Sequence, residues 1–328
     1  MASPAPSSPA AAVSHATVAP PSATGSPLLW MHHHITHFQG GTAHQWMCDS
    51  PHIPLVVAAV YVVLVHVAPP VLSRLLGGKT MPGLTAVVAA WNLFFSVASG
   101  VGFCYCAPFL YRVLTTTDRA LPGLAPKQDR VTGAWEAHPQ VRGGLVTSLC
   151  YWNRNIFEDG TTAFWLLTFN LSKILELMDT VFLLLKHKPV PFIHWYHHTS
   201  VMLFCWHAHV SGISNGLGFA VMNMWVHAIM YFYYFMCACG YRKLVRPFAS
   251  LVTLLQLLQM FTGMAIILYT TYLYLTHPGG CDTTASSLAF GTGMYFSYIV
   301  LFVKLFRDNY VLKKRGDRRD RRRDAKLE

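Results

Sequence analysis

Residues 251–276 read LVTLLQLLQMFTGMAIILYTTYLYLT, without a single charged side chain. A helix needs about 20 apolar residues to cross ~30 Å of hydrocarbon, so this stretch is long enough to span a membrane. We find seven runs of this kind along the chain, and each predicts a transmembrane helix. They lie near residues 53–73, 83–108, 161–185, 191–210, 215–239, 248–276 and 285–306. The sequence therefore predicts an all-α integral membrane protein with seven transmembrane helices.

The overall composition favours the same class. The chain of 328 residues is 53% hydrophobic and 12% charged, whereas ordinary soluble domains are about 25% charged. Its mean hydropathy is +0.36. The formal net charge is +11, but much of it lies in residues 313–326, after the last apolar run. We interpret this segment as a solvated tail and expect no nucleic-acid partner.

The chain divides into three parts. Residues 1–52 begin with an Ala-, Pro- and Ser-rich stretch and are predicted to form a largely disordered tail. Residues 53–310 hold the seven apolar runs and form the transmembrane domain, and residues 311–328 form the basic tail.

The basic residues predict the orientation, because short cytoplasmic loops are enriched in Lys and Arg. Residues 1–52 contain neither, nor do the connections 211–214 and 277–284. The connections on the other side contain Arg74, Lys79, Lys186, Lys188, Arg242, Lys243 and Arg246. The N-terminus is therefore predicted to be luminal and the C-terminus cytosolic. The long connection 109–160 is basic although it is predicted to be luminal, but long loops follow this rule poorly.

The eight cysteines contain no CxxC pair, and their spacing indicates neither a disulfide framework nor a zinc site. One luminal disulfide stays open, with no partners assigned.

Three ionisable residues interrupt the third apolar run. Lys173, Glu176 and Asp179 lie there, with Thr180 beside them. Spacings of three and four residues place them along one helix face, where Lys173 and Glu176 can pair. Ionisable groups inside a membrane are costly and usually mark a functional site. The alternative is a self-neutralising cluster that only holds helices together.

The fourth run opens with three histidines on one stripe. His194, His197 and His198 occupy positions i, i+3 and i+4, so their imidazoles project to one side of a helix. Two chemistries compete for them: metal binding by neutral imidazoles, and action as a nucleophile or general base.

Two further polar stripes follow in the fifth and sixth runs. The fifth run carries Asn223, His227, Tyr231 and Tyr234 on one helical face. The sixth run carries Thr253, Gln256 and Gln259 at three-residue spacing, which interhelical hydrogen bonding would equally explain. At ~1.5 Å per helical residue, all these polar groups lie in or near the cytosolic half of the bilayer. We therefore expect one pocket that opens toward the cytosol.

These residues resemble the motifs of the ELO family of very-long-chain fatty acid elongases. Residues 173–180 look like its KxxExxDT motif and 194–198 like its HxxHH box. Residues 223–234 match NxxxHxxMYxYY, and 253–259 match TxxQxxQ. The sequence around the histidine box looks most like the animal subgroup that acts on saturated and monounsaturated chains.

The resemblance implies an activity and a fold. The implied activity is that of a very-long-chain 3-oxoacyl-CoA synthase, an acyltransferase of the endoplasmic reticulum membrane that condenses acyl-CoA with malonyl-CoA. The implied fold has six helices around a tunnel sealed toward the lumen, with the first helix outside. Family members are thought to work by ping-pong transfer through histidine, without a metal or other cofactor. The reductases and dehydratase of the elongation cycle are expected partners, and a second copy of the chain is another.

We hypothesise roles on this basis. His197 carries the acyl group and His227 stabilises the enolate, although their covalent duties can exchange. His194 and His198 orient the reacting rings by hydrogen bonding. The residues expected to bind or position the substrates are Lys173, Glu176, Asp179, Asn223, Tyr231, Tyr234, Gln256 and Gln259. Cations expected to contact CoA phosphates are Lys186, Lys188, Arg242, Lys243 and Arg307.

Two other classes stay open. A di-iron desaturase or hydroxylase would use the HxxxH pair His33 and His37 with the HxxHH box, but those two histidines lie in the predicted luminal tail. A transporter or receptor would use the polar stripes as a permeation path or ligand pocket, but the sequence shows neither repeated halves nor broken helices.

Overall fold

A computed structural model describes residues 26–118, 121, 142–277 and 280–312. This part of the chain is helical and contains no strand, and Gln39 and Asp159 form an isolated bridge. The helices are α1 (Pro27–Thr36), α2 (Gly41–Asp49), α3 (His52–Leu75), α4 (Leu84–Thr115), α5 (Leu145–Cys150), α6 (Arg154–Phe157), α7 (Gly160–Leu175), α8 (Met178–Leu185), α9 (Phe192–Ser211), α10 (Gly216–Ala238), α11 (Arg242–Val245), α12 (Ala249–Thr276) and α13 (Ala285–Phe306). The all-α prediction is confirmed for the described residues.

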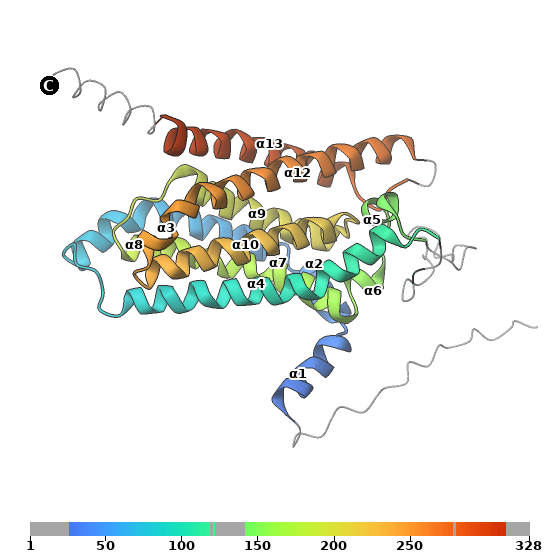
Figure 1. The fold of residues 1–328 in the computed structure, drawn as a ribbon, viewed down its shortest axis with the longest axis horizontal. Helices are drawn as coiled ribbons and strands as arrows, with labels where there is room; N and C mark the ends of the chain where they lie inside the picture. The colour runs from blue at the N-terminus through green and yellow to red at the C-terminus, as the bar shows by residue number, and fades with distance from the viewer. Residues whose placement is uncertain (1–25, 119–120, 122–141, 278–279, 313–328) are drawn as a thin grey trace, which may run out of the picture.

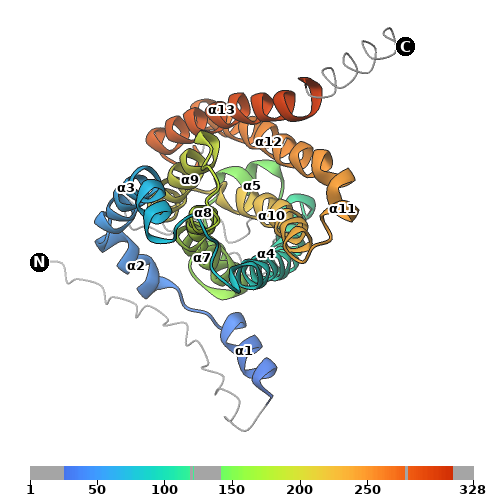
Figure 2. The same cartoon turned by 90° about the vertical axis from the view of Figure 1, so that its left-hand side faces the viewer.

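The long helices run side by side as a bundle, with α1 outside it (Figure 1). Seen along the bundle, α3, α9, α13, α12, α10, α4 and α7 are arranged around its middle (Figure 2). Gly263 of α12 lies directly against α13, where an added Cβ would collide with the ring of Tyr295. Small residues of this kind let two membrane helices pack closely.

Four described segments are long and apolar enough to cross a membrane: His52–Leu75, Leu84–Thr115, Arg242–Thr276 and Ala285–Leu312. They coincide with the first, second, sixth and seventh predicted spans, so the chain is a multi-pass membrane protein. Helices also form at the other three positions. These three segments do not reach the length and hydropathy of a membrane span. The third run is divided into two shorter helices, and polar side chains lower the mean hydropathy of the fourth and fifth. The count of seven spans stays a prediction.

The third apolar run is not one continuous helix. It divides at Glu176 and Leu177 into α7 and α8. The backbone tightens here, since the amides of Leu177, Asp179 and Thr180 each bond to the carbonyl three residues earlier. A tightened turn inside a helix often accompanies a functional site. This division falls within the polar cluster singled out in the sequence.

The N-terminal segment is more ordered than its composition predicts. Residues 27–36 and 41–49 are helical rather than disordered, because they have partners on the bundle. Trp46 of α2 packs edge-on against Trp206 of α9, with ring centroids 5.5 Å apart. The predicted disorder of residues 1–25 concerns a segment outside the described residues.

A disulfide joins Cys150, at the end of α5, to Cys281 in the connection between α12 and α13. Both segments lie in connections that are predicted to be luminal, although the basic-residue rule favours this side only for the connection that holds Cys281. The pairing answers the question that the spacing of the cysteines left open.

Candidate functional site: a histidine cluster at one end of an apolar cavity

A cavity lies inside the bundle and is lined mainly by apolar side chains of α7, α9, α10, α12 and α13. At one end His197, Asn223 and Gln259 line it. Toward the other end it reaches Gly212, the C-cap residue of α9, which lies fifteen positions after His197. A rise of 1.5 Å per residue makes this distance about 22 Å. The cavity therefore has the shape of a channel for a long, narrow apolar group.

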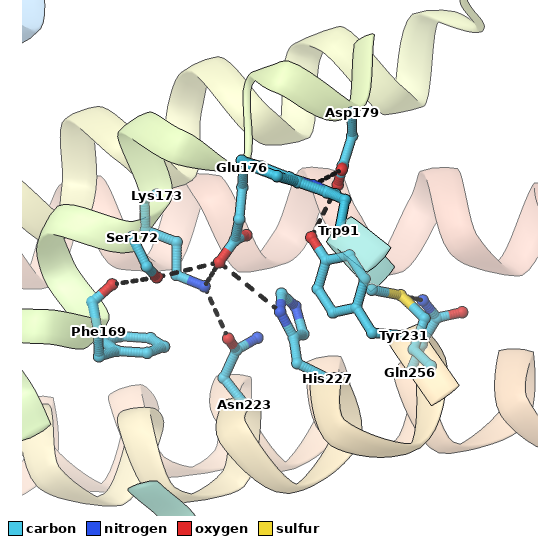
Figure 3. Close-up of polar contacts among 11 residues, drawn as sticks. Trp91, Phe169, Ser172, Lys173, Glu176, Asp179, Asn223, His227, Tyr231 and Gln256 are labelled. Atoms are coloured by element: carbon cyan, nitrogen blue, oxygen red, sulfur yellow. Dashed lines mark hydrogen bonds and ion pairs between the residues drawn. The ribbon is translucent and has the colours of Figure 1, made fainter. Parts of the chain in front are cut away.

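A buried ion pair lies next to the end of the cavity that His197 and Asn223 line. Lys173 and Glu176 are each 2% exposed, and the ammonium lies 2.7 Å from Glu176 Oε1 (Figure 3). Lys173 also donates to Asn223 Oδ1 at 3.0 Å, and Phe169 places its ring 4.3 Å from the same nitrogen. Two acceptors and an aromatic face compensate the charge for its loss of water.

Glu176 connects this pair to His227. Its Oε1 also accepts from Ser172 at 3.1 Å and lies 3.9 Å from His227 Nδ1. Its Oε2 is buried without a hydrogen-bond partner among the described residues. The carboxylate is thus positioned to bias the charge and the orientation of the neighbouring imidazole.

Asp179 faces a different set of partners. Its two oxygens accept from Trp91 Nε1 at 2.8 Å and from the Tyr231 hydroxyl at 2.7 Å. The carboxylate therefore ties α8 to α4 and α10 (Figure 3). Tyr231, predicted to bind substrate, is 1% exposed and belongs to this structural contact.

The histidine box is held by a chain of hydrogen bonds. Thr180 Oγ1 lies 2.9 Å from His194 Nε2 and 2.6 Å from the hydroxyl of Tyr61 on α3. The His194 ring packs on His198, with centroids 4.5 Å apart. His197 packs beside Tyr298, at 4.9 Å, and is the one histidine of the box that lines the cavity.

The predicted stripe residues do not all meet. Asn223 and Gln259 are buried and line the cavity. Gln256 donates to Met230 Sδ at 3.0 Å. Tyr234 is 44% exposed and packs against Tyr233. Its place at the end of the α10 stripe does not bring it to the cavity, because Asn223, about three turns earlier, is the last residue of α10 that lines the cavity.

The predicted phosphate-binding cations lie on α11 and at the ends of α8 and α13, which share one end of the bundle (Figure 2). Lys188, Arg242, Lys243 and Arg307 are exposed, and Arg307 pairs with Asp308 at 3.1 Å. Partial burial and the charge of Lys188 lower the pKa of Lys186. These groups face water rather than the buried ion pair.

Several residues of the site carried no signal in the sequence. Tyr61, Trp91 and Tyr298 lie in the first, second and last apolar runs, outside the four motifs. Their roles come from contacts across helices, which periodicity along one helix does not contain. An HxxHH box that needs orienting groups was the only hint to look for them.

A comparison with known families identifies the chain. The sequence model of the ELO family, described as the GNS1/SUR4 family, matches residues 46–318. The chain belongs to the ELO family. All residues predicted to act on substrate lie inside the matched region. The ELO-family resemblance drawn from the four motifs is thereby confirmed.

Curated proteins agree with this assignment. The ELO-family chain is 44% identical over 275 residues to fatty acid elongase 3 of Trypanosoma cruzi, covering 84% of this chain and 89% of that protein. It is 39% identical to fatty acid elongase 3 of Trypanosoma brucei brucei, over 85% and 90% of the two chains. It is 36% identical to very long chain fatty acid elongase 4 of T. cruzi, over 87% and 90%. These names give no saturation preference, so the expected similarity to the animal subgroup stays a prediction.

The two histidine motifs that a di-iron site would combine are not neighbours in this ELO-family fold. His33 and His37 stack on each other at 4.2 Å on α1, outside the bundle (Figure 1). Within the described ranges, no three His, Cys, Asp or Glu side chains are grouped so as to hold a metal ion.

Proposed function

We propose that this protein elongates fatty acids by condensing a long-chain acyl-CoA with malonyl-CoA to give 3-oxoacyl-CoA, carbon dioxide and CoA. The observation that carries the proposal is that His197 lines one end of a long apolar cavity, together with Asn223 and Gln259. The ELO-family membership and the elongase names of the relatives support the same activity.

In the first half-reaction a ring nitrogen of His197 attacks the thioester carbonyl carbon. The carbon–sulfur bond breaks, the imidazole gives up its proton, and free CoA leaves as a thiol. The acyl group remains on His197 as an acyl-imidazole, while its tail occupies the apolar cavity. Such a reactive intermediate lasts only where water is excluded, which the apolar lining favours.

In the second half-reaction malonyl-CoA loses carbon dioxide, and the electron pair of the broken bond forms an enolate. The enolate carbon attacks the acyl carbon, a new carbon–carbon bond forms, and the imidazole leaves and takes up a proton. His227 stabilises the negative charge that develops on the enolate oxygen. Glu176, 3.9 Å from His227 Nδ1, orients that ring.

The surrounding residues orient rather than react. The Lys173 ammonium holds Asn223, which lines the cavity, and the Thr180 hydroxyl holds His194. The exposed cations Lys188, Arg242 and Lys243 bind the phosphates of CoA at the cytosolic face. This chemistry calls for no resident metal or organic cofactor.

We place the enzyme in the endoplasmic reticulum membrane, with its N-terminus luminal and its C-terminus cytosolic. The Cys150–Cys281 disulfide supports this orientation, because disulfides persist in oxidising compartments such as that lumen. There the 3-oxoacyl-CoA product would pass to the reductases and the dehydratase of the elongation cycle.

Cysteine labelling tests the orientation. Exposed Cys239, just after α10, should react with a membrane-impermeant maleimide in sealed microsomes, whereas Cys48 on α2 should react only after permeabilisation. Cys239→Ser controls for the first signal. The reverse pattern would overturn the orientation.

The activity is tested with the purified full-length protein, a long-chain acyl-CoA and labelled malonyl-CoA. We expect a 3-oxoacyl-CoA two carbons longer than the acyl substrate, and none when malonyl-CoA is omitted. His197→Ala should abolish the product. His207→Ala should retain it, because that ring bonds to Ser287 and does not line the cavity. A desaturated or hydroxylated acyl chain, or uptake without condensation, would favour the other classes instead.

A further inference from the structure

The apolar cavity ends in a polar group of side chains, which the proposed chemistry does not use. His44 of α2, Asn170 of α7 and His209 of α9 line the cavity at the end away from His197. The rings of His44 and His209 lie 5.3 Å apart. We call these three residues the polar end. His209 is twelve positions after His197 on the same helix, which corresponds to about 18 Å.

The hydrogen bonding of His209 determines what its ring offers. Asn170 Nδ2 lies 3.2 Å from His209 Nδ1, and an amide nitrogen can only donate. Nδ1 is therefore the acceptor of this bond, and in the neutral ring the proton is on Nε2. His209 Nε2 is buried and has no hydrogen-bond partner among the described residues. The polar end thus contains a buried N–H donor that lacks an acceptor.

A channel that is apolar along its length and polar at the end away from His197 does not suit a simple hydrocarbon tail. A terminal methyl group that reached His209 would displace water from the N–H and offer no acceptor in return. Burying a donor without a partner is more costly than exchanging one partner for another. A chain whose far end carries an oxygen atom would satisfy the donor.

We propose that the polar end binds an oxygen substituent at the terminal carbon of the acyl chain, so that ω-oxygenated acyl-CoAs are a substrate class of this enzyme. The terminal hydroxyl oxygen accepts a hydrogen bond from His209 Nε2. Asn170 holds the ring in the required tautomer, and His44 on α2 completes the wall. This inference rests on the proposed function, because it requires the acyl tail to occupy the cavity.

The test compares matched pairs of acyl-CoAs, one ending in a methyl group and one in a hydroxyl, over a series of chain lengths. With the purified full-length protein, short pairs that do not reach His209 should be elongated equally. For pairs that reach it, we expect kcat/KM to favour the ω-hydroxy chain roughly tenfold, equivalent to about 1.4 kcal/mol.

Three variants assign the preference to the donor. His209→Leu should lose the preference and His209→Gln, whose amide retains an N–H donor, should keep most of it. His207→Leu removes a histidine two positions away that bonds to Ser287 and should change nothing. Elongation of short chains reports whether each variant is folded.

Each outcome is decisive. A preference that is present in the wild type and lost only in His209→Leu supports the proposal. A wild-type ratio near one at every length would overturn it, and would mean that water alone occupies the polar end. An equal preference in His209→Leu would also overturn it. Both results leave condensation of short chains intact, whereas failure of the wild type with every acyl-CoA would overturn the proposed function itself.

Discussion

Helices α9, α10 and α12 all line the cavity, but α9 and α10 differ from α12 in how they face their surroundings. Along α12 one side is exposed and apolar, with Leu258 at 52% and Leu268 at 54% exposure. Buried side chains of α9 and α10 include His198, Asn223 and His227. Hydropathy alone marks α12 as a membrane span and passes over the other two.

The polar residues of the inner network, by which we mean the contacts of Lys173 and Glu176 with Ser172, Asn223 and His227, depend on partners and not on lipid. Lys173 and Glu176 are almost fully buried and each has a charged or polar neighbour within 3.1 Å. In the bilayer no water replaces a lost partner. Substitutions in the inner network should therefore be costly, and substitutions on the lipid-facing side of α12 should not.

The largest effect is expected for His197→Ala. Loss of the nucleophile should lower kcat by roughly 10⁴-fold, since the acyl group would have no carrier. Rates of 3-oxoacyl-CoA formation by purified protein provide the measurement. Thermal unfolding in detergent, with His207→Ala as the matched variant, separates this loss from misfolding. A His197→Ala protein that condenses at the wild-type rate would contradict the assignment.

The next effect concerns the buried ion pair. Lys173→Met leaves the Glu176 carboxylate buried without its cation, which should cost about 3–5 kcal/mol of stability. Lys173→Met combined with Glu176→Gln removes both charges and should recover most of that loss. Unfolding in detergent, followed by intrinsic fluorescence, measures both. If the double variant is as unstable as the single one, charge burial is not the cause.

A smaller effect is expected at Tyr61, which extends the inner network to α3. Tyr61→Phe removes the hydrogen bond to Thr180, worth about 1 kcal/mol, and should lower kcat roughly fivefold with little change in KM. The double variant Tyr61→Phe with Thr180→Val should lose no more activity than Thr180→Val alone, because Tyr61 acts on His194 through its hydrogen bond to Thr180. Tyr272→Phe, at a site 59% exposed, is the control. Additive losses would separate Tyr61 from the histidine box.

The smallest effect is expected on the exposed side of α12. Leu268→Ala should change stability by less than about 0.5 kcal/mol, because its side chain faces lipid. The adjacent Ile267 is 2% exposed, and Ile267→Ala should cost about 2–5 kcal/mol. Unfolding of the two variants in the same detergent compares them. Equal losses would contradict the lipid-facing assignment of Leu268.

The helix positions could be predicted from the sequence, because an apolar run of about 20 residues predicts a helix by its length and composition alone. Helices form at all seven predicted runs. The pairing of Lys173 with Glu176 also followed, since a spacing of three residues brings side chains together on any helix. The division at Glu176 was missed because the tightened turn changes hydrogen bonding without interrupting the apolar pattern.

Contacts between distant segments could not be predicted. Nothing within α3 indicates that Tyr61 bonds to Thr180, and the resemblance placed that helix outside the tunnel. The cysteine spacing did not select Cys150 and Cys281, since the pairing depends on how α5 meets the connection after α12. The meeting of Asn170 with His209 depends in the same way on the packing of α7 against α9.

The central claim is that His197 carries the acyl group between the two half-reactions. Its most direct test is to mix the purified protein with an acyl-CoA in the absence of malonyl-CoA and to map the added mass on proteolytic peptides. We predict one acyl group on His197, formed as one equivalent of CoA is released and removed when malonyl-CoA is added. Release of CoA without any acyl adduct, together with full activity of His197→Ala, would contradict it.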